Sequence, residues 1–191
     1  YIPKSEILVT PTNREIAPLF ISYIFRYIYE RFIVRLFFLQ WFIAWKDGND
    51  FEIDINGKVK MDGFNVLKCP RSHFYADPFA YNNDGKSYIF FENYIYSEGK
   101  ANISVVEKQG NSFSKPQTVL QRPYHLSYPF IIEFNGEIYM IPETREAQCI
   151  EIYRCKQFPL KWELVERRFE GEEIVDTTIF EEKGKYYIFF N

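Results

Sequence analysis

The sequence has few of the residues that most often carry metal or redox chemistry. It holds only two histidines, three cysteines and two methionines in 191 residues. The histidines have no ligand spacing, so we expect no metal site, and no cofactor-binding motif is present. Three cysteines without the spacing of a disulfide framework are typical of reduced thiols and predict a cytoplasmic setting.

Charge of one sign and long apolar runs are also scarce. The net charge is −3 and no basic patch stands out, so nucleic acid is not an expected partner. The uncharged run from Ile16 to Phe25 is ten residues long, too short to cross a bilayer. Apolar residues make up 47% of the chain and aromatic residues 20%, which excludes disorder and favours β structure.

The chain contains instead a segment that occurs three times, at residues 77–92, 128–143 and 176–191. Each copy has two apolar runs around a dipeptide that ends in glycine. Asp-Gly and Asn-Gly favour a two-residue hairpin turn, because both central residues of that turn need a positive φ. A period near 50 residues indicates a repeat architecture. The three dipeptides are Asp84-Gly85, Asn135-Gly136 and Lys183-Gly184.

Two further strands are predicted after each of the first two hairpins, at 101–107 and 117–121, and at 149–155 and 162–169. Both faces of the hairpin strands are apolar, so each sheet must be covered on both sides, as in the blades of a propeller. We predict an all-β propeller of which about three blades are present, with the remaining blades in a longer protein or supplied from elsewhere.

The first 35 residues are predicted to form a helical extension, and residues 36–191 the partial propeller domain. Thr12 and Glu15 form a capping box that opens a helix over residues 16–34. This helix either packs on the propeller or lies on a membrane surface through residues 16–35, a stretch with three arginines. Residues 36–45 predict a buried strand, and residues 51–67 predict a hairpin around Asn56-Gly57 in the preceding blade.

Counting register from the hairpin turns places polar residues together at the open ends. Asp77 then faces Glu92, and opposed residues lie about 4.5–5.5 Å apart at Cβ. In a propeller the equivalent ends of all blades gather around the axis. Two carboxyls this close raise one pKa, which suits general acid–base chemistry. The alternative is that Asp77 caps a turn and Glu92 bonds the backbone. The same count pairs Tyr128 with Glu143 and Asp176 with Asn191.

The candidate catalytic residues are therefore Asp77, Glu143 and Asp176. The candidate substrate-binding residues are Glu92, His125, Tyr128 and Arg145. Each has a structural alternative: Glu143 holds the Tyr128 hydroxyl or an arginine, Asp176 bonds Thr177 or Thr178, and His125 is a structural histidine. His73 is less well placed than His125.

Several motifs resemble the N-terminal propeller domain of glucosamine inositolphosphorylceramide transferase and its bacterial relatives. The resemblance covers residues 36–191 and implies the five-bladed architecture of glycoside hydrolase families 43 and 32. Bacterial members occur in settings of surface-polysaccharide synthesis, and in the plant enzymes the transfer chemistry is assigned to a separate glycosyltransferase domain. The motifs are Phe74-Tyr75-Ala76-Asp77-Pro78-Phe79, Tyr88-Ile89-Phe90-Phe91-Glu92, His125-Leu126-Ser127-Tyr128-Pro129, Ile141-Pro142-Glu143 and Asp176-Thr177-Thr178.

The resemblance to family 43 implies roles for particular residues. Asp77 fits the aspartate base and Asp176 the aspartate that tunes a pKa, whereas the glutamic acid would lie beyond Asn191 unless Glu143 replaces it. We therefore expect a domain that acts on or binds a glycan in polysaccharide or glycolipid metabolism, with a glycosidase-like or glycosyl-transfer activity if it is an enzyme. The alternatives are a non-catalytic glycan-binding or scaffolding module with a glycosyltransferase as partner, and an inert truncated product.

Overall fold

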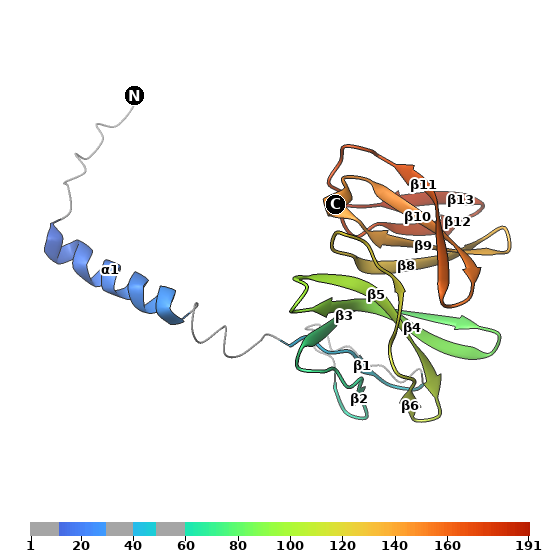
Figure 1. Cartoon of the computed structure of the whole chain (residues 1–191), viewed down its shortest axis with the longest axis horizontal. Helices are drawn as coiled ribbons and strands as arrows, with labels where there is room; N and C mark the ends of the chain where they lie inside the picture. Colours follow the sequence, from blue (N-terminus) through green and yellow to red (C-terminus); the bar gives the residue numbers. More distant parts are fainter. Residues whose placement is uncertain (1–11, 30–39, 49–59) are drawn as a thin grey trace. The chain divides into compact units, whose positions relative to one another are not determined.

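The computed structural model describes residues 12–29, 40–48 and 60–191 (Figure 1). The described part is mostly antiparallel β-sheet with one α-helix, as predicted. The chain divides into two compact units, residues 1–39 and residues 40–191. The predicted Asn56-Gly57 turn, and the predicted helix and strand positions from 30 to 39, lie outside the described residues.

Helix α1 (Asn13–Ile28) begins at the capping box that the sequence predicts. The Thr12 backbone N–H donates to the Glu15 carboxylate at 2.8 Å, which satisfies one of the orphan donors of the first turn. None of the residues from Asn13 to Ile28 is buried.

The first sheet is built from β3 (His73–Asn83), β4 (Lys86–Ile95), β5 (Lys100–Gln109) and β7 (Gln117–Leu120), with the short β6 (Ser112–Phe113) also paired to β5. Phe79 lies opposite Phe90 and Tyr81 opposite Tyr88, as counted from the Asp84-Gly85 turn. The predicted four strands of this repeat are confirmed.

The second sheet contains β8 (Ser127–Phe134), β9 (Glu137–Glu143), β10 (Ile150–Gln157) and β11 (Lys161–Arg168), and a third hairpin is formed by β12 (Thr178–Glu182) and β13 (Lys185–Phe189). The predicted turns are confirmed in all three repeats. Asp84, Asn135 and Lys183 have φ values of 49°, 51° and 53°, each followed by a glycine with positive φ.

The predicted register at the open ends is wrong by one residue in all three hairpins. Glu92 pairs with Ala76 instead of Asp77, and Glu143 pairs with Ser127 instead of Tyr128. In the third hairpin Asn191 exchanges backbone hydrogen bonds with Val175 instead of Asp176. In the first two hairpins a β-bulge causes the shift, because two residues of one strand there oppose a single residue of its partner.

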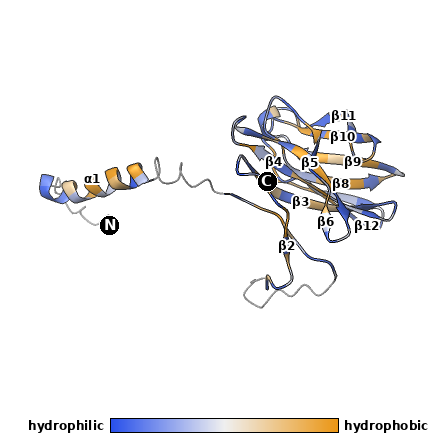
Figure 2. Cartoon of the chain, turned by 60° about the horizontal axis from the view of Figure 1, so that its bottom comes forward, coloured by the Kyte–Doolittle hydropathy of each residue, from blue (hydrophilic) through white to orange (hydrophobic). Residues whose placement is uncertain are grey.

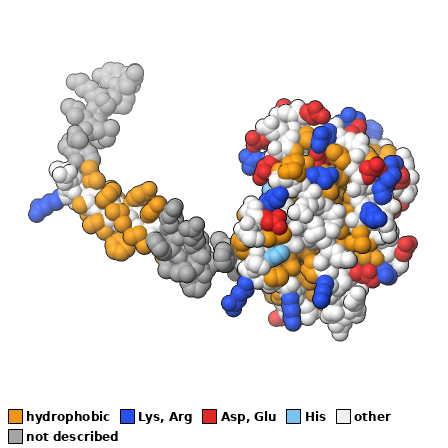
Figure 3. All heavy atoms as spheres, in the orientation of Figure 1, with side chains coloured by type: hydrophobic (Ala, Val, Ile, Leu, Met, Phe, Trp, Pro, Cys, Tyr) orange, Lys and Arg blue, Asp and Glu red, His pale blue; other side chains and the backbone are white. Residues whose placement is uncertain are grey.

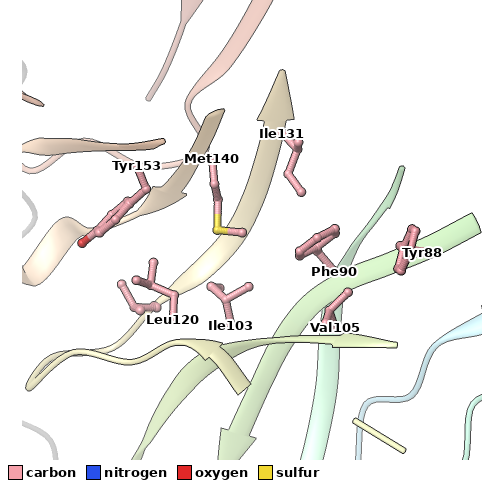
Figure 4. Packing of buried hydrophobic residues seen from close by; sticks show 9 residues of the cluster. Tyr88, Phe90, Ile103, Val105, Leu120, Ile131, Met140 and Tyr153 are labelled. Carbon is pink, nitrogen blue, oxygen red and sulfur yellow. The ribbon is translucent and has the colours of Figure 1, made fainter. Parts of the chain in front are cut away.

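The first and second sheets pack face to face around a shared apolar core (Figure 4). Phe90 of β4, Met140 of β9 and Tyr153 of β10 are fully buried in it. A second cluster around Phe91 and Val106 covers the other face of the first sheet, and a third around Ile141 lies against the second sheet. Both faces of the first and second sheets therefore carry packed apolar side chains, as predicted. Figure 2 shows these apolar strands within the β unit.

Of the predicted buried strand over residues 36–45, the structure describes residues 40–45, and the prediction holds at the end of this part. Ala44–Trp45 forms β1, which pairs with β2 (Asn65–Val66), and Ile43 is buried. Trp41 and Phe42 are instead exposed, because the strand pairing begins after them.

Candidate functional site

The same residue of each repeat adopts a strained backbone at the start of its hairpin. Asp77, Tyr128 and Asp176 have φ values of 47°, 44° and 54°. A positive φ is unusual for any residue with a side chain and a clear outlier for a bulky one such as Tyr128. Such strain concentrates at functional sites, where surrounding structure holds it in place. The Tyr128 N–H donates to Oδ2 of Asp77 at 3.2 Å, so the start of β8 holds the carboxylate of β3.

Glu92 is the most strongly perturbed carboxyl of this region. Its side chain projects from the middle of the first sheet and only 6% of the residue is exposed. Burial, followed by the charge of Asp77, a hydrogen bond with Asp77 and the charge of Glu143, raises the pKa of Glu92 to about 8. A pKa of about 8 means that Glu92 holds a proton at neutral pH.

His125, in the loop before β8, contacts Glu92 through a defined tautomer. The Ala101 backbone N–H donates to Nδ1 of His125 at 3.2 Å, which assigns the ring proton to Nε2. Nε2 lies 3.4 Å from Oε1 of Glu92. Burial lowers the pKa of His125, although the charges of Glu146 and Asp77 oppose this effect. The neutral ring thus presents an N–H to the Glu92 carboxyl.

The pKa of Glu143, at the end of β9, depends on the charges of neighbouring carboxyls, as the pKa of Glu92 does. Burial and then the charge of Asp176 raise the pKa of Glu143, while a hydrogen bond from the Asp176 backbone N–H and the charge of Arg145 lower it. The charge of Asp77 acts in the same direction as that of Asp176. Asp77, Glu92, Glu143 and Asp176 therefore interact as one group of carboxyls.

Two of the hydrogen bonds predicted as structural alternatives differ from those in the structure. The Tyr128 hydroxyl bonds Oγ1 of Thr178 at 2.8 Å and not Glu143. The Thr178 hydroxyl also donates to the backbone carbonyl of Asp176 at 3.4 Å. The side-chain carboxyl of Asp176 belongs to the group of four carboxyls described above. Arg145, at the start of the short helix η2 (Arg145–Ala147), binds Glu173 through two nitrogens at 3.0 and 2.8 Å.

Two pockets adjoin at the contact between Glu92 and His125. One of about 440 Å³ contains Asp77 and Glu92. The other, of about 360 Å³, contains His125, Glu143 and Arg145. The seven predicted site residues thus lie in or beside one region at the starts and ends of the inner strands.

Sequence reasoning missed several residues that line these pockets. Trp41 and Phe42 line the larger pocket, and the apolar run that contains them reads as a buried strand. Glu146 and Gln148 line the smaller one, and their position just after the inner strand ending at Glu143 is the signal that could have found them. Glu173 also lines it and has no comparable signal.

His73 has a structural role. Its Nδ1 contacts Oδ1 of Asn93 at 2.7 Å, and Asn93 donates to the buried Ser104 hydroxyl at 3.0 Å. Among the residues that the structure describes, no group of three or more histidine, cysteine, aspartate or glutamate side chains is arranged to hold a metal ion.

The hydrogen bond between Asp77 and Glu92 constrains the chemistry of the site. Hydrolytic carboxyl pairs are about 5–5.5 Å apart in retaining enzymes and about 6.5–9.5 Å apart in inverting enzymes. The charge of Asp77 raises the pKa of Glu92, after burial, so Glu92 keeps its proton beside Asp77. A second carboxyl, such as Glu143, would have to complete a hydrolytic pair.

The region that contains this site matches a known protein family. Residues 64–191 match the family model of glucosamine inositolphosphorylceramide transferase 1, N-terminal. The chain is 36% identical over 119 residues to glucosamine inositolphosphorylceramide transferase 1 of Arabidopsis thaliana, a match that covers 61% of this chain and 15% of that protein. Proteins of the same name from Oryza sativa subsp. indica and japonica are 32% identical over 120 residues, covering 62% of this chain and 16% of each relative. The match thus spans about 15% of the length of these relatives.

Proposed function

The chain belongs to the family of the N-terminal region of glucosamine inositolphosphorylceramide transferase 1, and from this premise we propose that it is a carbohydrate-active domain. It binds or acts on a glycan in polysaccharide or glycolipid metabolism, through the carboxyls at the open ends of its inner strands. Its sheets are blades of a five-bladed propeller related to glycoside hydrolases. The repeat period and the face-to-face packing of the first and second sheets support this architecture.

The observation that carries the proposal is the protonated Glu92 beside Asp77. A carboxyl that keeps its proton at neutral pH can donate a hydrogen bond to a sugar oxygen, whereas the adjoining carboxylate accepts from a sugar hydroxyl. Neutral His125 adds a second donor at 3.4 Å from Glu92. Such a set of donors and acceptors suits a polyhydroxylated ligand.

In the hydrolytic form of the proposal, Asp77 accepts a proton from a water molecule whose oxygen bonds to the anomeric carbon. The glycosidic C–O bond breaks, and Glu143 gives its proton to the leaving oxygen. The charge of Asp176 supports this role, because it raises the pKa of Glu143 and so helps Glu143 to keep its proton. Arg145 and Tyr128 position the sugar.

The second candidate is a non-catalytic module that binds glycans or positions a partner glycosyltransferase. One observation favours it: the matched region is about 15% of relatives that are named as transferases, so the rest of those proteins has ample length for the transfer chemistry. The close spacing of Asp77 and Glu92 is also compatible with binding alone.

A combined binding and turnover experiment separates the two candidates. Calorimetric titration and hydrolysis of nitrophenyl glycosides are measured for the protein, for Asp77→Asn, and for Asp84→Asn as a matched change in the turn of the same hairpin. Turnover that is present in the unchanged protein and in Asp84→Asn but lost in Asp77→Asn supports the enzyme. Binding without turnover in the unchanged protein supports the module, and no binding to any glycan contradicts both.

Helix α1 supports a further part of the proposal, peripheral contact with a membrane surface through residues 16–35. Large apolar side chains cover α1 and are exposed (Figure 3). Among the described residues no helix is long and apolar enough to cross a bilayer. Arginines and tyrosines beside such an apolar surface are typical of helices that lie in the interface. The cytoplasmic location remains a prediction from the cysteines.

A further inference from the structure

Two aromatic side chains next to the carboxyl pair have no role in the core. Trp41 is 65% exposed and Phe42 is 55% exposed. The other two tryptophans, Trp45 and Trp162, are half-buried, and Trp45 packs edge-on against Phe113. Burying a large aromatic ring is favourable, so a ring left open beside a polar site indicates a surface that a ligand covers.

The backbone that carries these aromatics is fixed by hydrogen bonds on each side. The Tyr75 N–H donates to the Trp41 carbonyl at 3.3 Å, and the Leu67 N–H donates to the Ile43 carbonyl at 2.9 Å. The side-chain amide of Gln40 donates to the Pro70 carbonyl at 3.1 Å. Trp41 and Phe42 therefore stand on a segment tied to β3 and to the loops before it, which preorganises them for binding.

Both aromatics share one pocket of about 440 Å³ with Asp77 and Glu92. We infer that Trp41 and Phe42 form a stacking wall for a pyranose ring, whose polar groups bond Asp77 and Glu92. The ring is neutral or carries an amine. This inference rests on the proposed function and adds to it the class of sugar and the residues that hold its apolar face.

The charge of the region decides between sugar classes. Glu143 and Glu146 line the pocket beside the one that holds Asp77 and Glu92, and the charge of Glu143 acts on Glu92. Arg145, which lines the smaller pocket, already binds Glu173. A carboxylated sugar would meet like charge, whereas hydroxyls and an ammonium group would meet acceptors. An ammonium group near the indole of Trp41 would also gain a cation–π contact.

The inference is tested with methyl glycosides of glucose, glucosamine and glucuronic acid. Their affinities are measured by calorimetry for the full chain, for Trp41→Ala and for Phe180→Ala, an exposed aromatic outside this pocket. Tryptophan emission is followed in the same titrations, because Trp41 is the most exposed of the three tryptophans. Trp41→Phe tests whether a smaller ring restores binding.

We expect the glucoside and the glucosaminide to change tryptophan emission and to bind more tightly than the glucuronide. Trp41→Ala should weaken their binding about tenfold, a loss that corresponds to one stacked ring. Trp41→Phe should recover most of it, and Phe180→Ala should have no effect. Unchanged affinity in Trp41→Ala, with affinity lost in Asp77→Asn, would overturn the stacking wall and leave the proposed function intact. Tighter binding of the glucuronide would overturn the assignment of sugar class, and no binding at all would overturn the inference together with the proposed function.

Discussion

At the scale of single residues, the site depends on where one proton resides. Burial is the first cause of the raised pKa of Glu92, and the charge of Asp77 is the second. Burial arises only when the first sheet is packed, whereas the charge of Asp77 comes from the neighbouring strand of the same hairpin. The sequence predicts that Asp77 and Glu92 lie close together, but it cannot predict which of them keeps the proton, because that depends on tertiary burial.

We predict that Glu92 titrates with a pKa of about 8. Carbon-detected NMR of the glutamate carboxyls measures this value directly. In Asp77→Asn the pKa of Glu92 should fall, because a charge and a hydrogen bond are lost, but it should stay above the ordinary value of 4.5 because burial remains. A Glu92 carboxyl that titrates near 4.5 in the unchanged protein would contradict this prediction.

At the scale of elements, the turn residues of the hairpins predict the strand register near the turn but not at the open ends. Turn residues fix the register near Asp84-Gly85 because the turn geometry requires positive φ there. The shift at the open ends has no glycine to signal it, since Asp77, Tyr128 and Asp176 adopt positive φ without being glycine. The sequence therefore places the site in the correct region but misassigns its strand partners.

The Lys183-Gly184 turn should be the weakest of the three. Lys183 has a φ of 53°, a conformation that favours asparagine over residues with long side chains. Lys183→Asn should raise the free energy of unfolding by about 0.5–1 kcal/mol, and Asn135→Lys should lower it by a similar amount. Urea unfolding of both variants checks the pair. Free energies of unfolding equal to that of the unchanged protein would mean that tertiary packing, and not the turn residue, determines the stability of these hairpins.

Helix α1 should bind vesicles through its apolar side chains. Leu19 and Phe20 are 71% and 60% exposed. Arg14, Ser22 and Arg26 are spaced in multiples of four and therefore lie on one polar stripe of the helix. Leu19→Gln with Phe20→Gln should reduce cosedimentation with vesicles of phosphatidylcholine and phosphatidylserine at least tenfold. Ser22→Gln is the matched control and should bind normally. Equal binding by all three proteins, or self-association of α1 in place of lipid binding, would refute the membrane contact.

At the scale of the whole molecule, the stability of the packed sheets depends on pH through the protonation of Glu92. The folded pKa of Glu92 is about 8 and its ordinary value is 4.5, so between these values the folded state holds a proton that the unfolded state has released. The stability from Glu92 is fully present below about pH 4.5 and is lost as the pH rises through about 8. The raised pKa of Glu143 acts in the same direction.

Stability should therefore fall with rising pH in a way that depends on Glu92. Between pH 5 and pH 8, the unchanged protein should lose about 1 kcal/mol per pH unit relative to Glu92→Gln, which has no proton to release. Chemical unfolding of both proteins at a series of pH values gives this difference. The lowered pKa values of Glu151 and His125 act in the opposite direction. The effect of Glu151 cancels in the comparison, whereas His125 contacts Glu92 and contributes to the measured difference. Parallel curves for the two proteins would show that Glu92 holds no extra proton in the folded state.

The most direct test of the account is the pH dependence of glycan binding at the carboxyl pair. Calorimetry from pH 6 to pH 9 should show that binding of methyl glucoside weakens as Glu92 loses its proton near pH 8. Binding by Glu92→Gln should be independent of pH over this range, and Asp77→Asn should bind at least tenfold more weakly than Asp84→Asn. Binding that is unchanged from pH 6 to pH 9 in the unchanged protein, or equal in Asp77→Asn and Asp84→Asn, would contradict the proposal that this carboxyl pair is the glycan site.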